Sequence, residues 1–82
     1  MRYVNVRMVS GNRRSKLFAF KTLINNLEKG EWVLVDTQFG PQVARVDGYV
    51  TSEELGFRPY KWLIERIDYS DKLNLLEGSV EL

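Results

Sequence analysis

Hydrophobic and polar residues alternate, or form short apolar blocks, in five separate stretches of this sequence. Alternation with a period of two is typical of a strand that buries one face, and a continuous apolar block is typical of a strand buried on both faces. Turn-forming residues separate the stretches, so we predict five strands. They are residues 2–9, 16–21, 31–37, 42–47 and 60–68.

The first two predicted strands are joined by residues 10–15, which are rich in Ser, Gly and Asn and therefore indicate a chain reversal. In the second strand, Phe18 and Phe20 share one face. Leu17 and Ala19 share the other face. We expect one pair to face the core and the other to be partly exposed, in a hairpin with a basic tip.

The third predicted strand contains consecutive apolar residues at 32–35. We therefore expect it to be buried on both faces and to lie at the centre of the sheet. The Gly-Pro pair predicts a turn over residues 38–41, and the strand that follows places Ala44 and Val46 on one face. These two strands form a second predicted hairpin.

Helical signals are short and local. Residues 51–56 carry an N-cap residue, two acidic residues and a final Gly, which predicts one helical turn. Residues 22–29 fit either a loop or a short 3₁₀ segment. Residues 70–82 predict a short helix or a frayed tail.

Five short strands joined by turns predict a mainly β fold: a small five-stranded antiparallel SH3-like or partly open barrel with short helical turns. A two-layer α+β sheet is the alternative. No repeat and no low-complexity linker divides the sequence, so we expect residues 1–82 to form a single domain. We expect Trp32 and Trp62 to pack in its core.

The composition excludes most enzyme chemistry. The sequence contains no His and no Cys, so His general bases, thiol nucleophiles, disulfides and the His and Cys ligands of metals are missing, and a site made only of carboxylates remains possible. Glu53 and Glu54 are neighbours on a predicted helical turn, which fits charges at a helix end better than a carboxylate site. We predict a protein that is not an enzyme, with no catalytic residue, metal, cofactor or small-molecule substrate.

Residues 29–46 contain a Gly, a strongly apolar strand, a Gly-containing turn and a strand with a small residue. This order resembles the core of SH3-like barrels. It is similar to the corresponding piece of PSP1-type domains and of the N-terminal DNA-binding domain of the primosomal helicase. The resemblance implies a fold and carries no function.

Most of the chain resembles small uncharacterised proteins of phages and prophages from Gram-positive bacteria. The matching segments are Phe-x-Phe-Lys-Thr at 18–22, Lys-Gly-x-x-Val-x-Val-Asp-Thr-x-x-Gly-x-x-Val-Ala at 29–44, and Lys-Trp-Leu-Ile…Ile-Asp at 61–68. The resemblance implies a phage origin and a β-rich fold. No apolar run approaches the roughly 18 residues of a membrane-spanning helix, and a signal peptide is not recognised. We therefore expect the protein to act in the cytoplasm of the host cell and not to associate with a membrane.

The formal net charge of +1 conceals an asymmetry along the chain. Residues 1–30 contain seven Lys and Arg and one Glu, which gives +6, whereas residues 31–82 contain five Lys and Arg and ten acidic residues, which gives −5. Segments of opposite charge can form a nucleic-acid face, or they can attract each other in a compact fold or a head-to-tail oligomer.

The basic hairpin is the candidate binding surface. Its cations can neutralise phosphates and its aromatic rings can stack on bases, as in single-strand binding by small barrels. A solvated turn followed by core aromatics is the alternative interpretation. The candidate residues are Arg7, Arg13, Arg14, Lys16, Phe18, Phe20 and Lys21.

Two functions remain open. The first is a non-catalytic protein-interaction module of phage or prophage type, which binds a host or phage protein or forms a homo-oligomer. The alternative is a small nucleic-acid-binding accessory protein that uses the basic hairpin. The acidic residues would repel phosphate unless they lie on the opposite face, so the charge balance favours the first function.

Overall fold

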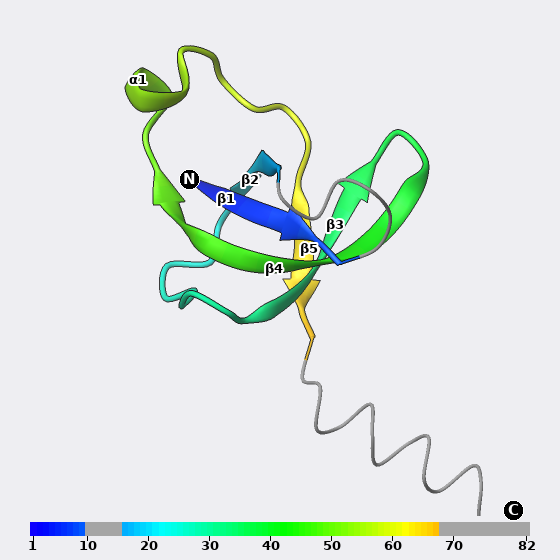
Figure 1. Ribbon diagram of the computed structural model, residues 1–82. Coiled ribbons are helices and arrows are strands. Elements are labelled where there is room, and N and C mark those ends of the chain that lie inside the picture. The colour runs from blue at the N-terminus through cyan, green and yellow to red at the C-terminus, as the bar shows by residue number, and fades with distance from the viewer. Residues whose placement is uncertain (10–15, 68–82) are drawn as a thin grey trace, which may run out of the picture.

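The computed structural model describes residues 1–9 and 16–67, which form five strands and one short helix. Each strand pairs antiparallel with its neighbours in the order β2-β1-β4-β3-β5, and the sheet curls into a small, partly open barrel (Figure 1). The predicted mainly β fold is therefore confirmed. The elements are β1 (Arg2–Met8), β2 (Leu17–Thr22), β3 (Trp32–Thr37), β4 (Gly40–Val50), α1 (Ser52–Leu55) and β5 (Leu63–Arg66).

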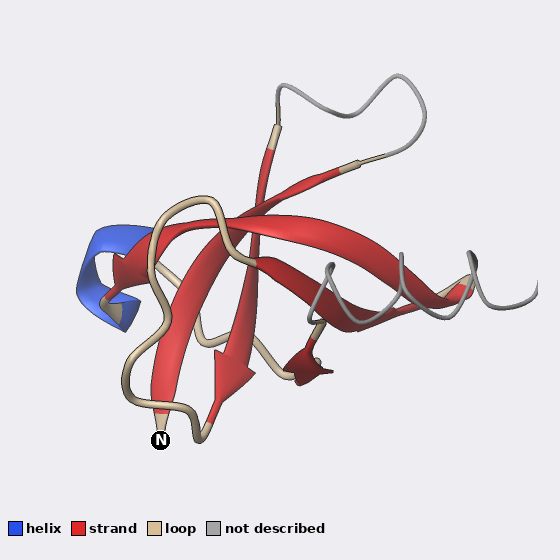
Figure 2. Cartoon of the chain, turned by 90° about the horizontal axis from the view of Figure 1, so that it is seen from below, coloured by secondary structure: helices blue, strands red, loops and turns tan. Residues whose placement is uncertain are grey.

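The curl depends on β4, the longest strand, which pairs with β1 along one part and with β3 along another. A shift in the β1–β4 register between Asn5 and Val6 bends the ladder. The strands curl around a common interior (Figure 2). The two outermost strands, β2 and β5, thereby approach each other. Here the backbone N–H of Lys21 donates to the Lys61 carbonyl oxygen over 2.9 Å, and Lys21 forms a parallel bridge with Trp62. We call this contact between Lys21, Lys61 and Trp62 the seam.

The core lies inside the curl and is built from the inward positions of all five strands. Val4, Val6 and Met8 are buried on β1, as the alternation predicts. Ala44 and Val46 are buried on β4, again as predicted. The other buried apolar residues of the core cluster are Phe20, Leu27, Val33, Val35 and Leu63.

β3 is buried on one face only, so the prediction that both of its faces are buried is wrong. Val33 and Val35 are fully buried, whereas Trp32 is only half-buried on the outer face. Trp32 lies against Arg45, whose Cζ is 5.1 Å from the ring centroid. The guanidinium of a neighbouring side chain thus lies over an aromatic ring on the outer face of this strand, where the described residues form no second layer. The central strand is β4 and not β3.

The turn between β3 and β4 is tighter than the predicted turn over residues 38–41. It consists of Gln38 and Phe39, because Gly40 already pairs with Thr37 as the first residue of β4. Gly40 has φ +95°, in the left-handed region that glycine adopts without strain. The glycine therefore allows the chain to reverse within two residues.

β5 is shorter than the predicted strand at 60–68, and the prediction that Trp62 packs in the core is wrong. Trp62 is 40% exposed and Tyr60 is 76% exposed, while Leu63 turns inward and is buried. The alternation of this stretch is right, but its aromatic positions face outward. The last residue of the predicted strand, residue 68, lies outside the described residues.

The predicted helical turn at residues 51–56 is confirmed as α1. Thr51 caps it, since its hydroxyl oxygen accepts a hydrogen bond of 3.1 Å from the backbone N–H of Glu54. Gly56 ends it in the left-handed conformation. In the part of the chain that the structure describes, this four-residue helix provides no helical layer, so the α+β alternative is not formed.

Residues 23–29 form a loop without helix, which is one of the two predicted alternatives. The Tyr49 hydroxyl holds this loop against β4. It accepts a hydrogen bond of 3.0 Å from the Leu27 N–H and donates one to the Ile24 carbonyl oxygen. The predictions for residues 10–15 and 70–82 lie outside the described residues. No described helix has the length and apolar character needed to cross a bilayer.

Candidate functional site

The described residues of the predicted basic surface do not converge on one site. Arg7 is exposed on β1, and its Nε lies 3.6 Å from the Asp47 carboxylate. The ammonium group of Lys21 lies over the Trp62 ring, 4.5 Å from its centroid. Lys16 is exposed immediately before β2. The other two predicted cations, Arg13 and Arg14, lie outside the described residues.

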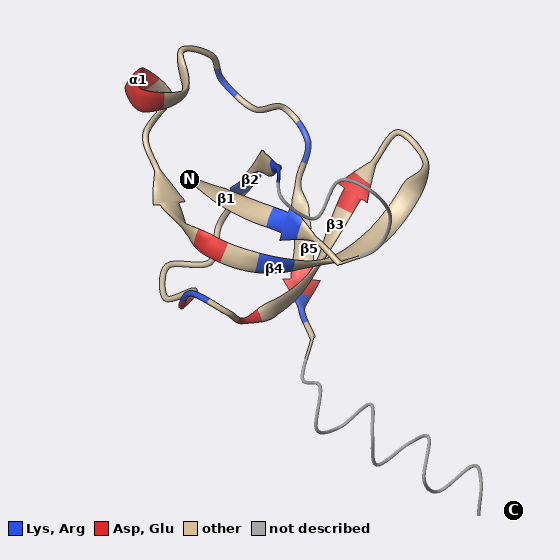
Figure 3. Ribbon diagram, viewed as in Figure 1, with Lys and Arg blue, Asp and Glu red and all other residues tan. Residues whose placement is uncertain are grey.

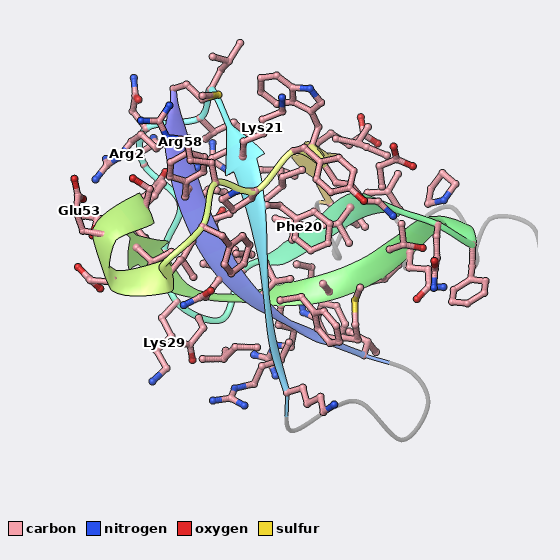
Figure 4. The ribbon with its side chains drawn as sticks, turned by 90° about the horizontal axis from the view of Figure 1, so that it is seen from above. Arg2, Phe20, Lys21, Lys29, Glu53 and Arg58 are labelled. Atoms are coloured by element: carbon pink, nitrogen blue, oxygen red, sulfur yellow. The ribbon has the colours of Figure 1, made fainter. Side chains whose placement is uncertain are left out.

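The two aromatic residues of the predicted surface both lie on the inner side of β2. Phe20 is only 4% exposed and belongs to the core, so it is not available to stack on a ligand (Figure 4). Phe18 is half-buried and packs against that core. Leu17 and Ala19 are the partly exposed pair on the other side of the strand, as the alternation allows.

The charge asymmetry of the sequence does not produce two separate faces on β1 and β4. Arg7 pairs across the ladder with Arg45, and Asp47 lies close by, so both signs are adjacent there (Figure 3). Other cations lie over aromatic rings: the guanidinium of Arg2 is 3.8 Å from the centroid of the Tyr49 ring. Much of the basic charge is thus engaged within the molecule.

A concave groove of about 690 Å³ lies beside β2. It is lined by the end of β1, by residues 17–20 of β2, by the β3–β4 turn with Gln42, and by the segment between α1 and β5. Met8, Phe20 and Pro59 are buried and contribute to its lining. This volume is within the range of about 300–1,000 Å³ that is usual for binding sites. We call it the aromatic groove.

Exposed aromatic side chains concentrate at the aromatic groove. Phe39 is 71% exposed, Phe57 is 57% exposed and Tyr60 is 76% exposed, and all three line it. Together with Leu17 they make up half of the large exposed hydrophobic residues in the described part of the chain. Contiguous exposed apolar surface of this kind is a common feature of interaction sites.

The electrostatics of the aromatic groove are simple. Lys61 is the single charged residue among the described residues that line it, and its ammonium lies 5.8 Å from the centroid of the Tyr60 ring. The polar lining residues Thr37, Gln38 and Gln42 are uncharged. The site therefore combines apolar rings with one cation and no carboxylate, a composition suited to binding rather than to acid–base chemistry.

Of the residues that line the aromatic groove, the sequence predicts Phe18 and Phe20 on β2 as part of a binding surface, but not Phe39, Phe57 or Tyr60. Phe39 lies within the predicted turn at 38–41. Phe57 comes directly after the Gly that ends the predicted helical turn. An aromatic residue in a predicted turn or loop cannot be buried by strand alternation, so these positions were a usable signal. Tyr60 offers no such signal, because the sequence pattern places it at the start of a predicted strand.

A polar cluster at the end of β5 is structural. The Nε of Arg66 lies 2.8 Å from a carboxylate oxygen of Glu31, and another of its guanidinium nitrogens donates to the Asn26 carbonyl oxygen over 2.9 Å. Glu31 also accepts a hydrogen bond from the Glu28 N–H. Burial alone would raise the pKa of Glu31, but the Glu28 N–H and the Arg66 guanidinium outweigh it and hold that pKa below its usual value.

Replacing Glu31 with Gln should therefore reduce the acid dependence of stability. A lowered carboxyl pKa contributes stability above the unfolded-state pKa of about 4.3 and loses it as the pH falls through the folded-state pKa. We expect Glu31→Gln to cost about 1 kcal/mol at neutral pH and progressively less in acid. Urea unfolding at a series of pH values, followed by tryptophan fluorescence, measures this. Equal losses at neutral and acidic pH would contradict it.

Among residues 1–9 and 16–67, no group of three or more Asp or Glu residues is arranged to hold a metal ion. No protein-family model, curated protein or solved structure matches the chain. The resemblances to phage proteins and to SH3-like barrels remain predictions.

Proposed function

We propose that this chain is a non-catalytic protein-interaction module of phage or prophage type, acting in the host cytoplasm, which binds a partner protein through the aromatic groove. The observation that carries the proposal is the concentration of exposed rings at a single concave site, namely Phe39, Phe57 and Tyr60. Aromatic side chains are enriched at protein interfaces and dominate their binding energy.

The charges near the aromatic groove support a protein partner over a nucleic acid. Binding of a single strand requires several cations along the phosphate backbone, and Lys61 is the one cation among the described lining residues. Lys21, the cation of the seam next to the groove, lies over the ring of Trp62.

Nucleic-acid binding is the second candidate, because one observation favours it. Phe39, Phe57 and Tyr60 are exposed enough to stack on bases, and Lys61 lies beside Tyr60. In this function, the nucleic-acid strand would lie in the aromatic groove, beyond the hairpin face that the sequence predicts. It requires binding that weakens steeply with salt.

A random-peptide library displayed on phage tests the proposal. We expect the protein to enrich peptides whose synthetic forms bind it in solution by fluorescence anisotropy. Phe39→Ser and Tyr60→Ser should each weaken that binding by about tenfold or more, because an exposed ring at the centre of a contact is lost. Neither change should affect folding, since both side chains are largely exposed.

Leu23→Ser is the matched control, because Leu23 is 71% exposed, like Phe39, but does not line the aromatic groove. It should leave peptide binding unchanged. Failure to enrich any peptide would overturn the proposal. Salt-sensitive binding of a labelled oligothymidine that is lost in Phe39→Ser would establish the second candidate instead.

A further inference from the structure

We infer that the aromatic groove takes its partner as an extended peptide that adds to the free edge of β2. This inference rests on the proposed function and specifies how the partner is held. Its starting point is that β2 is an outermost strand of the sheet: it pairs with β1 on one side and, among residues 1–9 and 16–67, meets another segment on its other side only at the seam.

The direction of the backbone groups on β2 follows from the seam. The N–H of Lys21 donates to Lys61 and therefore points away from β1. Residues two apart on a strand point the same way, so the N–H and carbonyl groups of Leu17 and Ala19 also point away from β1. No hydrogen bond from these outward groups to another described segment is found.

The free edge and the aromatic groove coincide. Residues 17–20 of β2 line the groove, and on the other side of it lie Phe57, Pro59 and Tyr60 from the segment before β5. That segment reaches β2 only at the seam. An extended peptide placed in the groove would continue the hydrogen bonding of β2 from Lys21 toward Leu17, in the way that peptides extend exposed sheet edges.

The lining determines which peptide fits. In an added strand alternate side chains point to the same face, so one set would reach the apolar lining that includes Met8 and Pro59 and the exposed ring of Phe39. Lys61 in the lining and Lys16 immediately before β2 favour acidic residues in the peptide. We therefore assign the ligand as a partner segment with alternating apolar residues and acidic flanks.

The short free edge and its flanking lysines disfavour a second copy of this chain as the occupant. Lys21 already uses its outward N–H at the seam, so two β2 edges could pair antiparallel only over Leu17 and Ala19, with Lys16 of each copy beside that short ladder. Lysines at the two ends of an exposed edge are also a common protection against pairing between identical edges.

The test uses the tightest peptide from the library selection and the backbone of Ala19. We expect the Ala19 amide to exchange with solvent about tenfold more slowly, or slower still, when the peptide is bound. Ala19→Pro removes the outward N–H without breaking the β1–β2 ladder, so it should weaken binding by about tenfold. Ala19→Val keeps the N–H and measures the effect of a larger side chain at this lining position, so Ala19→Pro should weaken binding clearly more than Ala19→Val does.

The outcomes separate this inference from the proposed function. If Phe39→Ser abolishes peptide binding but the Ala19 amide is not protected, the aromatic groove binds peptides by side chains alone and strand addition is wrong. If no peptide binds, the proposed function itself fails. Should Ala19→Pro not fold, amide exchange in the wild-type complex still decides the question. If the protein without peptide is a dimer in light scattering and its Ala19 amide is already protected from exchange, a second copy occupies the edge of β2. That result would overturn the peptide as the occupant.

Discussion

Replacing Phe20 with Ala is expected to lower the free energy of unfolding by about 3–5 kcal/mol, the usual cost of emptying a buried phenylalanine site. Phe20 is the largest buried side chain contributed by β2 and belongs to the cluster that joins β1, β3 and β4. A domain of this size has a total stability of about 4–12 kcal/mol, so the variant loses a large share of it. Urea unfolding followed by tryptophan fluorescence measures the loss.

Phe18→Ala is the matched control for this prediction. Phe18 lies on the same side of β2, two residues earlier, but is only half-buried. We expect it to cost about half as much, because less apolar area is removed from the core. Equal losses of unfolding free energy in the two variants would show that Phe20 is not more deeply buried than Phe18. The result also matters for binding studies, since Phe20→Ala would impair the aromatic groove through the fold.

The strands could be predicted because inward positions alternate strictly. Val4, Val6 and Met8 are buried in β1 as expected, and the capped turn at Thr51 forms for a local reason that the sequence displays. Burial of Trp32 was predicted wrongly because a run of apolar residues does not show whether a second layer exists. That depends on how the sheet curls, which is a property of the whole chain and not of one segment.

The candidate site could be predicted only in part. The sequence places Phe18 and Phe20 together on β2, but the decision about which of them reaches the surface depends on the segment that covers the strand. Phe57 and Tyr60 come to the same groove from the far end of the chain, after the sheet has curled. Local sequence patterns do not show that the segment with Phe57 and Tyr60 comes close to β2. The exposure of Phe39, in contrast, can be predicted from its position in a turn.

Replacing Lys21 with Pro is expected to cost about 3 kcal/mol, because it opens the seam that joins the two outermost strands. The change removes the N–H that donates to Lys61 and leaves a carbonyl oxygen without its partner, which accounts for about 2 kcal/mol. It also removes the ammonium group over the Trp62 ring, which contributes about 0.5–1 kcal/mol. Urea unfolding gives the loss, and amide exchange at Leu63 and Glu65, which pair with β3, shows whether β5 loosens first.

Two variants separate the backbone from the side chain in this prediction. Lys21→Ala keeps the N–H and should lose only the contact with Trp62, about 1 kcal/mol or less. Ala19→Pro changes the same side of the same strand two residues away, where the N–H has no partner among the described residues, so it should cost clearly less than Lys21→Pro. If the two proline variants cost the same, the seam adds nothing to stability. The edge of β2 would then be equivalent along its length, and the distinction between a closed part at Lys21 and an open part at Ala19, on which strand addition depends, would be lost.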